Sequence, residues 1–222
     1  MNSISLAVRS ASPHRHVLVL LLALLVAPNV GAQKAAEASP PADALYRQAT
    51  APLDARVDDL LARMTVEEKV GQMTQLTLQA VTRAQGTSVA GPTAQAEAAA
   101  SGAYEEWDLD PDSLRRALVD YHLGSMLNVV SHGYDVPTWR GILTQVQRVA
   151  TEETRLGIPI LYGVDAVHGA NYVQGGTLFP HNLALGATFN RELARVAGAV
   201  TARETGATGV PWTFSPVLDV GR

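Results

Sequence analysis

The spacing of apolar residues alternates along the chain between a helical period and a strand-like one. From Asp54 onward the apolar residues recur at helical spacing, and Thr65 with Glu68 forms the capping-box pattern of a helix start. Three further helices are predicted to begin at Asp110 with Pro111, at Pro137 and at Asn190, and the first two are predicted to end at Gly124 and Gly157. The predicted apolar faces are Val57, Leu60, Leu61 and Met64; Leu114, Leu118 and Tyr121; Trp139, Leu143, Val146 and Ala150; and Leu193, Val196, Ala197 and Val200.

Apolar runs between these helices predict four strands, at 70–78, 125–130, 158–164 and 212–220. Alternating helices and strands favour parallel βα units, either in a doubly wound sheet or in a (β/α)8 barrel. A complete barrel needs eight strands and about 250 residues, so four strands amount to about half of one. Half a barrel leaves two sheet edges and part of the core uncovered, which predicts that the chain is a fragment of a longer one.

The first 32 residues have the pattern of a secretory signal peptide. Arg9 and Arg15 precede an unbroken apolar run at 17–27, no acid is present, and Val30 and Ala32 suit cleavage before Gln33. The run is too short to span a bilayer, which takes about 20 residues. Removing the segment leaves 190 residues and takes away two arginines and no acid, which lowers the formal charge from −4 to −6. The sequence therefore predicts an exported acidic protein, periplasmic or extracellular, with no membrane contact after cleavage.

Two other segments lack large apolar residues at regular spacing. Residues 33–52 are rich in Ala, Pro and Gln and are predicted to be a disordered linker. Residues 84–103 are rich in Ala, Gly, Ser and Thr and are longer than an ordinary connection, which predicts a surface insertion. Neither segment is assigned a function.

The composition excludes several classes of catalytic site and of binding partner. The 222 residues are 47% apolar and 17% charged, as in globular proteins, and contain no Cys, which excludes disulfides, thiolate catalysis and Cys-ligated zinc. Seventeen Lys and Arg stand against 21 Asp and Glu, so nucleic acid is not an expected partner. A serine elbow, a Gly-x-Gly-x-x-Gly motif and a Walker loop are all missing.

Asp165 is the leading candidate for a functional residue. It stands in the sequence Gly-Val-Asp-Ala-Val-His-Gly at 163–169, where a predicted buried strand ends. Parallel α/β folds place ligand-facing side chains at this position. One interpretation is a carboxylate that caps the following loop through backbone N–H groups. The other is a carboxylate that binds substrate hydroxyls, since an ionised Asp accepts up to about four hydrogen bonds.

Two histidines lie downstream of Asp165 and raise the question of a metal. Histidine is the commonest metal ligand, and His168 and His181 have Asn171 and Asn182 nearby. Neither a His-x-His nor a His-Glu-x-x-His pattern is present, however. We therefore expect no metal site and interpret these histidines, like His122 and His132, as structural.

Three segments resemble the amino-terminal barrel domain of glycoside hydrolase family 3, the family of β-glucosidases and exo-β-glucanases. They read ARVDDLLARMTVEEKVGQMTQ at 55–75, TRLGIPILYGVDAVHGANYVQGGTLFPHNLALGATFN at 154–190 and ETGATGVPWTFSPVLDVGR at 204–222. The resemblance runs from about Leu53 to Arg222, interrupted by the insertion. It implies that 53–222 are the incomplete amino-terminal part of this domain, with an α/β fold and a partial (β/α)8 TIM-type barrel, about its first half.

The resemblance also implies the chemistry. Family members hydrolyse terminal β-glycosidic bonds with retention, using an Asp nucleophile and a Glu acid/base that would both lie beyond residue 222, so no catalytic residue is expected in this chain and the fragment alone is expected to be inactive. The family's Asp-Ala-Val-His-Gly motif binds the hydroxyls of the sugar in the −1 subsite through its Asp, which assigns that role to Asp165. Phe179, Pro180 and His181 would support the pocket, and His168 and His181 would lie behind the sugar-binding residue. The implied substrate is a β-linked oligosaccharide or an aryl or alkyl β-glucoside, without a cofactor.

Two other functions remain open on the sequence. One is a carbohydrate-binding barrel that lacks catalysis, and the other is an unrelated metal-dependent barrel hydrolase. A downstream segment bearing the nucleophile would favour the glycosidase over the binding protein. Metal analysis of the full-length protein would decide whether it is a metal-dependent hydrolase.

Overall fold

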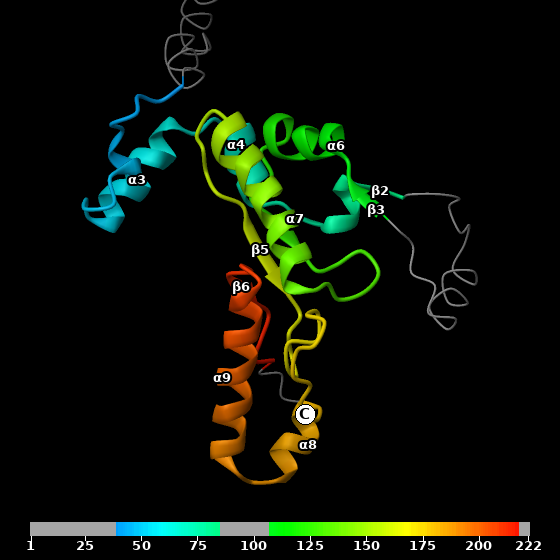
Figure 1. Ribbon diagram of the computed structural model, residues 1–222. Coiled ribbons are helices and arrows are strands. Elements are labelled where there is room, and N and C mark those ends of the chain that lie inside the picture. Colours follow the sequence, from blue (N-terminus) through cyan, green and yellow to red (C-terminus); the bar gives the residue numbers. More distant parts are fainter. Residues whose placement is uncertain (1–38, 85–106, 218–222) are drawn as a thin grey trace, which may run out of the picture. The chain divides into compact units, whose positions relative to one another are not determined.

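The computed structural model describes residues 39–84 and 107–217 (Figure 1). The predicted signal peptide, the first part of the predicted linker, nearly all of the predicted insertion and the last residues of the fourth predicted strand lie outside these ranges. Among the described residues, no helix combines the length and apolar character needed to cross a membrane.

Four strands form one parallel sheet. They are β1 (Gln75–Thr77), β4 (Ser125–Leu127), β5 (Leu161–Val164) and β6 (Trp212–Thr213), and their order in the sheet follows the chain. Leu127 lies opposite Gly163 in the β4–β5 pair, and Gly163 lies opposite Trp212 in the β5–β6 pair. The α/β class with a parallel sheet is therefore confirmed.

Helices precede β1 and occupy the connections between the strands of the parallel sheet. The helices are α3 (Leu53–Arg63), α4 (Val66–Gln72), α6 (Pro111–Arg115), α7 (Val136–Arg148), α8 (Asn182–Ala187) and α9 (Arg191–Ala207). π-Helical turns η3 (Arg116–Asp120) and η4 (Val149–Glu153) extend α6 and α7. The Thr65–Glu68 capping box forms, and the Asn190 side chain accepts from the N–H groups of Glu192 and Leu193. Local side-chain bonding thus starts α4 and α9 where the sequence predicts.

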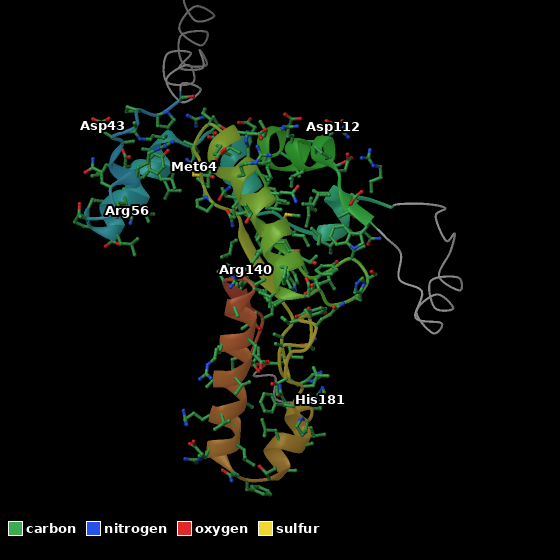
Figure 2. All side chains as sticks on the ribbon, viewed as in Figure 1. Asp43, Arg56, Met64, Asp112, Arg140 and His181 are labelled. Carbon is green, nitrogen blue, oxygen red and sulfur yellow. The ribbon has the colours of Figure 1, made fainter. Side chains whose placement is uncertain are left out.

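The core lies between the sheet and α7. Trp139 and Val146 of α7 are fully enclosed, as are Met126 of β4 and Tyr162 of β5. The rings of Trp139 and Tyr162 meet edge to face with centroids 5.6 Å apart. In Figure 2, Arg140 points from α7 toward the end of α9, where its Nη2 donates to the carbonyl of Ala207 at 2.9 Å. A guanidinium there stabilises the carbonyl end of the helix dipole.

Several predicted boundaries differ from the structure. The strands expected at 125–130 and 158–164 are shorter, and the helix expected to end at Gly157 ends with η4 at Glu153. The strand expected at 70–78 begins only at Gln75, since the helix capped by Thr65 continues to Gln72. Gly124 does not end the helix before it: His122 takes the left-handed conformation there, with φ 55°. A Cβ on Gly124 would lie 2.3 Å from the carbonyl oxygen of Gln72, so glycine is needed for close approach of the backbones.

Part of the predicted linker is ordered. Residues Leu45–Arg47 form the 3₁₀ turn η1, and Ala44 beside them is buried. The hydroxyl of Tyr46 donates to the carbonyl of Leu156 at 2.7 Å, across 110 positions of sequence. Arg47 Nη2 donates to the same carbonyl at 3.3 Å, and the Tyr46 N–H donates to Asp59 Oδ2 at 3.1 Å. Composition does not indicate these contacts, because each depends on a residue outside the segment.

A short antiparallel pair joins β2 (Thr82–Ala84) to β3 (Trp107–Leu109). The 3₁₀ turn η2 (Leu78–Val81) leads from β1 into β2. The apolar pattern gives no signal for this ribbon, whose strands lie on either side of residues 85–106. Ala84 lies opposite Trp107, so the chain leaves β2 and re-enters β3 at adjacent positions.

The face of α9 that the sequence predicts to be buried is largely open. Leu193 and Val196 are 46% and 39% exposed, and the buried residues of the helix are Ala197, Thr201 and Thr205. Apolar periodicity identifies the amphipathic helix correctly, but it does not say what covers its apolar face.

A buried ion pair ties α4 to the segment that leads into β5. Arg155 Nε donates to Glu68 Oε1 at 2.9 Å, and Arg155 Nη2 also donates to the carbonyl of Arg63 at 2.8 Å. Burial disfavours the Glu68 carboxylate, but the bonds from Arg155 and from the Thr65 N–H outweigh this and hold the pKa of Glu68 below its ordinary value.

We expect Glu68→Gln to lower the free energy of unfolding by about 3 kcal/mol near neutral pH, because it removes the buried carboxylate that pairs with the partly buried Arg155 guanidinium. The folded pKa of Glu68 is below the unfolded value of about 4.3, so the stabilisation is complete above that value and is lost as the pH falls through the folded pKa. Urea titrations should therefore show the wild-type advantage shrinking in acid. Glu192→Gln, in an exposed pair with Arg195, is the control and should have no measurable effect. A difference that does not depend on pH would contradict the assignment.

Candidate functional site

Two polar side chains follow adjacent parallel strands at the same edge of the sheet. Asn128 comes directly after β4, and Asp165 comes directly after β5. Because the carboxyl ends of paired parallel strands meet at one edge, the register of β4 with β5 brings these two residues together. Sequence reasoning identified Asp165 but missed Asn128, although both share the signal of a polar residue directly after an apolar strand.

The two side chains are joined by a pair of hydrogen bonds. Asn128 Nδ2 donates to Asp165 Oδ2 at 2.9 Å, and the Asp165 N–H donates to Asn128 Oδ1 at 3.1 Å. The Asp165 side chain is half-buried. Within the described ranges, its carboxylate accepts no backbone N–H from the loop that follows, so the loop-capping interpretation is not what the geometry supports.

The loops after β4 and β5 are tied to each other around this pair. Tyr134 and Val173 form a parallel bridge, and the Gln174 N–H donates to the carbonyl of Tyr134 at 2.9 Å. Trp139 Nε1 donates to the carbonyl of Tyr172 at 2.8 Å. Through this bond, α7 holds the loop after β5, which contains the Asp-Ala-Val-His-Gly motif.

Burial raises the pKa of three tyrosines near the pair above the ordinary value of about 10. Burial raises the pKa of Tyr134 to about 12, and its hydroxyl accepts from the Val130 N–H at 2.8 Å. Burial also raises the pKa of Tyr162, whose hydroxyl donates to the carbonyl of Asn128 at 2.7 Å. The pKa of Tyr172 is raised by burial and then by the negative charge of Asp165. A tyrosine is already neutral at pH 7, so these shifts leave its charge there unchanged and only extend the neutral form to higher pH.

The two candidate histidines lie along the same loop, but neither has a hydrogen bond to Asp165 in the described parts of the chain. Their ring centroids are 5.9 Å apart. His168 has a buried Nδ1 for which the described residues provide no partner, and its carbonyl accepts from the Phe179 N–H at 2.8 Å. His181 is exposed and precedes α8 (Figure 2). Their support of the pocket stays a prediction.

Two wide hollows of the described chain do not include Asp165 in their lining. A groove of about 760 Å³ is lined by His168, Phe179 and residues of α8 and α9, and a second of about 770 Å³ lies between α4 and η3. Residues 39–84 and 107–217 contain no group of three His, Asp or Glu side chains placed to hold a metal ion.

Comparison with known proteins identifies the family. The model of the glycosyl hydrolase family 3 N terminal domain matches residues 65–222. The chain belongs to glycosyl hydrolase family 3. This family 3 chain is 38% identical over 176 residues to the lysosomal beta glucosidase of Dictyostelium discoideum, a match that covers 76% of this chain and 19% of that protein. It is 30% identical over 169 residues to the periplasmic beta-glucosidase of Salmonella typhimurium, covering 76% and 17%.

A solved family 3 structure has a similar fold. The exo-1,3/1,4-beta-glucanase ExoP from a Pseudoalteromonas species matches with a TM-score of 0.54 and 31% identity, over 73% of this chain and 17% of that one. The chain thus spans about a fifth of the length of the relatives it matches.

The bond from Tyr162 to Asn128 can be tested through stability. We expect Tyr162→Phe to lower the free energy of unfolding by about 1 kcal/mol, because the Asn128 carbonyl loses its donor. Urea unfolding of the two proteins measures the difference. Tyr121→Phe, which removes a hydroxyl from a side chain that is 69% exposed, is the matched control. Equal effects of the two variants would show that the buried bond contributes nothing.

Proposed function

We propose that the full-length protein hydrolyses terminal β-glycosidic bonds as a retaining β-glucosidase and that Asp165 binds hydroxyls of the sugar in the −1 subsite. The observation that carries this proposal is the Asp165 carboxylate, half-exposed at the carboxyl end of β5 and oriented by Asn128, in a chain of glycosyl hydrolase family 3. An ionised carboxylate there accepts hydrogen bonds from a polyol.

The hydrogen bonding of Asp165 supports binding rather than bond cleavage. A retaining glycosidase uses two carboxyl groups about 5 to 5.5 Å apart, one as nucleophile and one as acid/base. Asp165 is bonded to a neutral amide instead of a second acid. Its proposed contribution is to hold the sugar ring in position while other residues of the full-length protein carry out the attack and the proton transfer.

The proposed architecture is the first half of a (β/α)8 barrel within residues 53–222. Four parallel strands in chain order, separated by helices, support it, as does the position of Asp165 at the end of the sheet where barrel enzymes bind substrate. The proposed substrates are β-linked oligosaccharides and aryl or alkyl β-glucosides, in keeping with the beta-glucosidases and the exo-1,3/1,4-beta-glucanase among the similar proteins.

The proposed location is the periplasm or the cell exterior. The signal-peptide pattern of residues 1–32 supports export, and one similar protein is named a periplasmic beta-glucosidase.

We expect Asp165→Ala in the full-length protein to lower kcat/KM on an aryl β-glucoside by about 100-fold, since a charge-assisted hydrogen bond contributes about 1.5 to 3 kcal/mol. Initial rates across substrate concentrations measure this. Asp135→Asn is the matched control: it neutralises the carboxylate that caps α7 while keeping an acceptor for the Thr138 N–H, and should leave kcat/KM unchanged. An Asp165→Ala enzyme of wild-type efficiency would overturn the proposal, and saccharide binding without any hydrolysis by the wild type would instead favour a binding protein.

A further inference from the structure

The geometry points to Asn128 as a positioning residue that fixes the orientation of the Asp165 carboxylate, an inference that rests on the sugar-binding role proposed for Asp165. Asn128 touches no substrate in this assignment. It acts through Asp165, by deciding which carboxylate oxygen is left for a sugar hydroxyl.

The backbone of Asn128 is fixed at both of its polar groups. Its N–H donates to the carbonyl of Gly163 at 2.9 Å, and its carbonyl accepts from the hydroxyl of Tyr162 at 2.7 Å. Its φ of 57° lies in the left-handed region, which Asn tolerates better than most residues. The side chain therefore starts from a defined point beside the end of β5.

The chemistry of Asp165 determines how the amide is turned. A backbone N–H can only donate, so the group of Asn128 that faces the Asp165 N–H must be the oxygen Oδ1, at 3.1 Å. This directs Nδ2 toward the carboxylate, where it donates to Oδ2 at 2.9 Å. One amide thus grips the backbone and the side chain of the same residue, which restricts rotation of the Asp165 side chain.

The bond from Asn128 leaves the two carboxylate oxygens of Asp165 with different hydrogen bonding. Oδ2 accepts from Asn128, whereas Oδ1 has no protein donor among the residues that the structure describes. A sugar hydroxyl that donates to Oδ1 meets an acceptor whose direction is already set. Binding then costs less side-chain entropy than it would with a freely rotating carboxylate.

Two substitutions separate positioning from a merely structural role. Asn128→Gly keeps the left-handed backbone without strain and removes both side-chain bonds. Asn128→Asp keeps the acceptor for the Asp165 N–H but replaces the donor by an oxygen that repels the carboxylate. Both variants also weaken the loop, so the two roles are separated by repeating each change in an Asp165→Ala background. A merely structural loss persists there, whereas a loss that acts through the Asp165 carboxylate does not.

The test measures kcat/KM on an aryl β-glucoside in the full-length protein. We expect Asn128→Gly to lower kcat/KM by about 10-fold to 100-fold and Asn128→Asp to lower it further. In an Asp165→Ala background, either change should alter kcat/KM by less than about threefold, because the group through which Asn128 acts is gone. Asn190→Gly is the matched control: it removes an Asn that also bonds two polar groups, but at the start of α9, and should leave kcat/KM unchanged.

The outcomes distinguish this inference from the function it rests on. If Asp165→Ala has no effect, the proposed function fails. If Asp165→Ala is damaging but both Asn128 variants are as active as the wild type, the function stands and the positioning role is overturned. The role is also overturned if the loss from either Asn128 variant persists in full in the Asp165→Ala background. Urea unfolding of each variant verifies that a lost activity is not lost folding.

Discussion

The parallel register of β4 with β5 is the constraint on which the candidate site depends. With Leu127 opposite Gly163, Asn128 follows one residue after the aligned pair and Asp165 two residues after it, and both emerge at the edge where β4 and β5 end. A slip of one position would turn every side chain of a strand to its other face. Gly163 also has no space for a side chain, since a Cβ there would lie 2.5 Å from Phe214 Cζ. The strand that positions Asp165 is thus packed closely by aromatic residues at and after β6.

Glu68 and Asp165 differ in burial and in hydrogen-bond partner, and these differences suit the first to a structural role and the second to the proposed binding role. Glu68 is buried and its carboxylate is matched by a guanidinium that also holds the end of α3. Asp165 is half-buried, faces an amide, and retains an oxygen that the described chain leaves without a donor. A neutral partner orients the carboxylate without cancelling its charge, which suits a group that must still attract a ligand.

Sequence reasoning succeeded where structure is determined locally. Thr65 and Asn190 cap helices through bonds two or three residues away, and an acid after an apolar strand marks the end of a sheet. It failed where distant segments decide the outcome. The need for glycine at 124 comes from Gln72, the order at Tyr46 comes from Leu156, and the partnership of Asn128 with Asp165 spans 37 positions. The open face of α9 has the same cause, because periodicity describes a helix and not its neighbour.

The β2–β3 ribbon has a consequence for how such a chain tolerates change. Its two short strands pair the backbone of Ala84 with that of Trp107, so the ends of the intervening segment are already held together. The entropy of closing a loop grows only slowly with its length. Lengthening, shortening or exchanging what lies between these two positions would therefore leave β1 and α6 in place, and the ribbon offers a natural point for grafting a new module onto this scaffold.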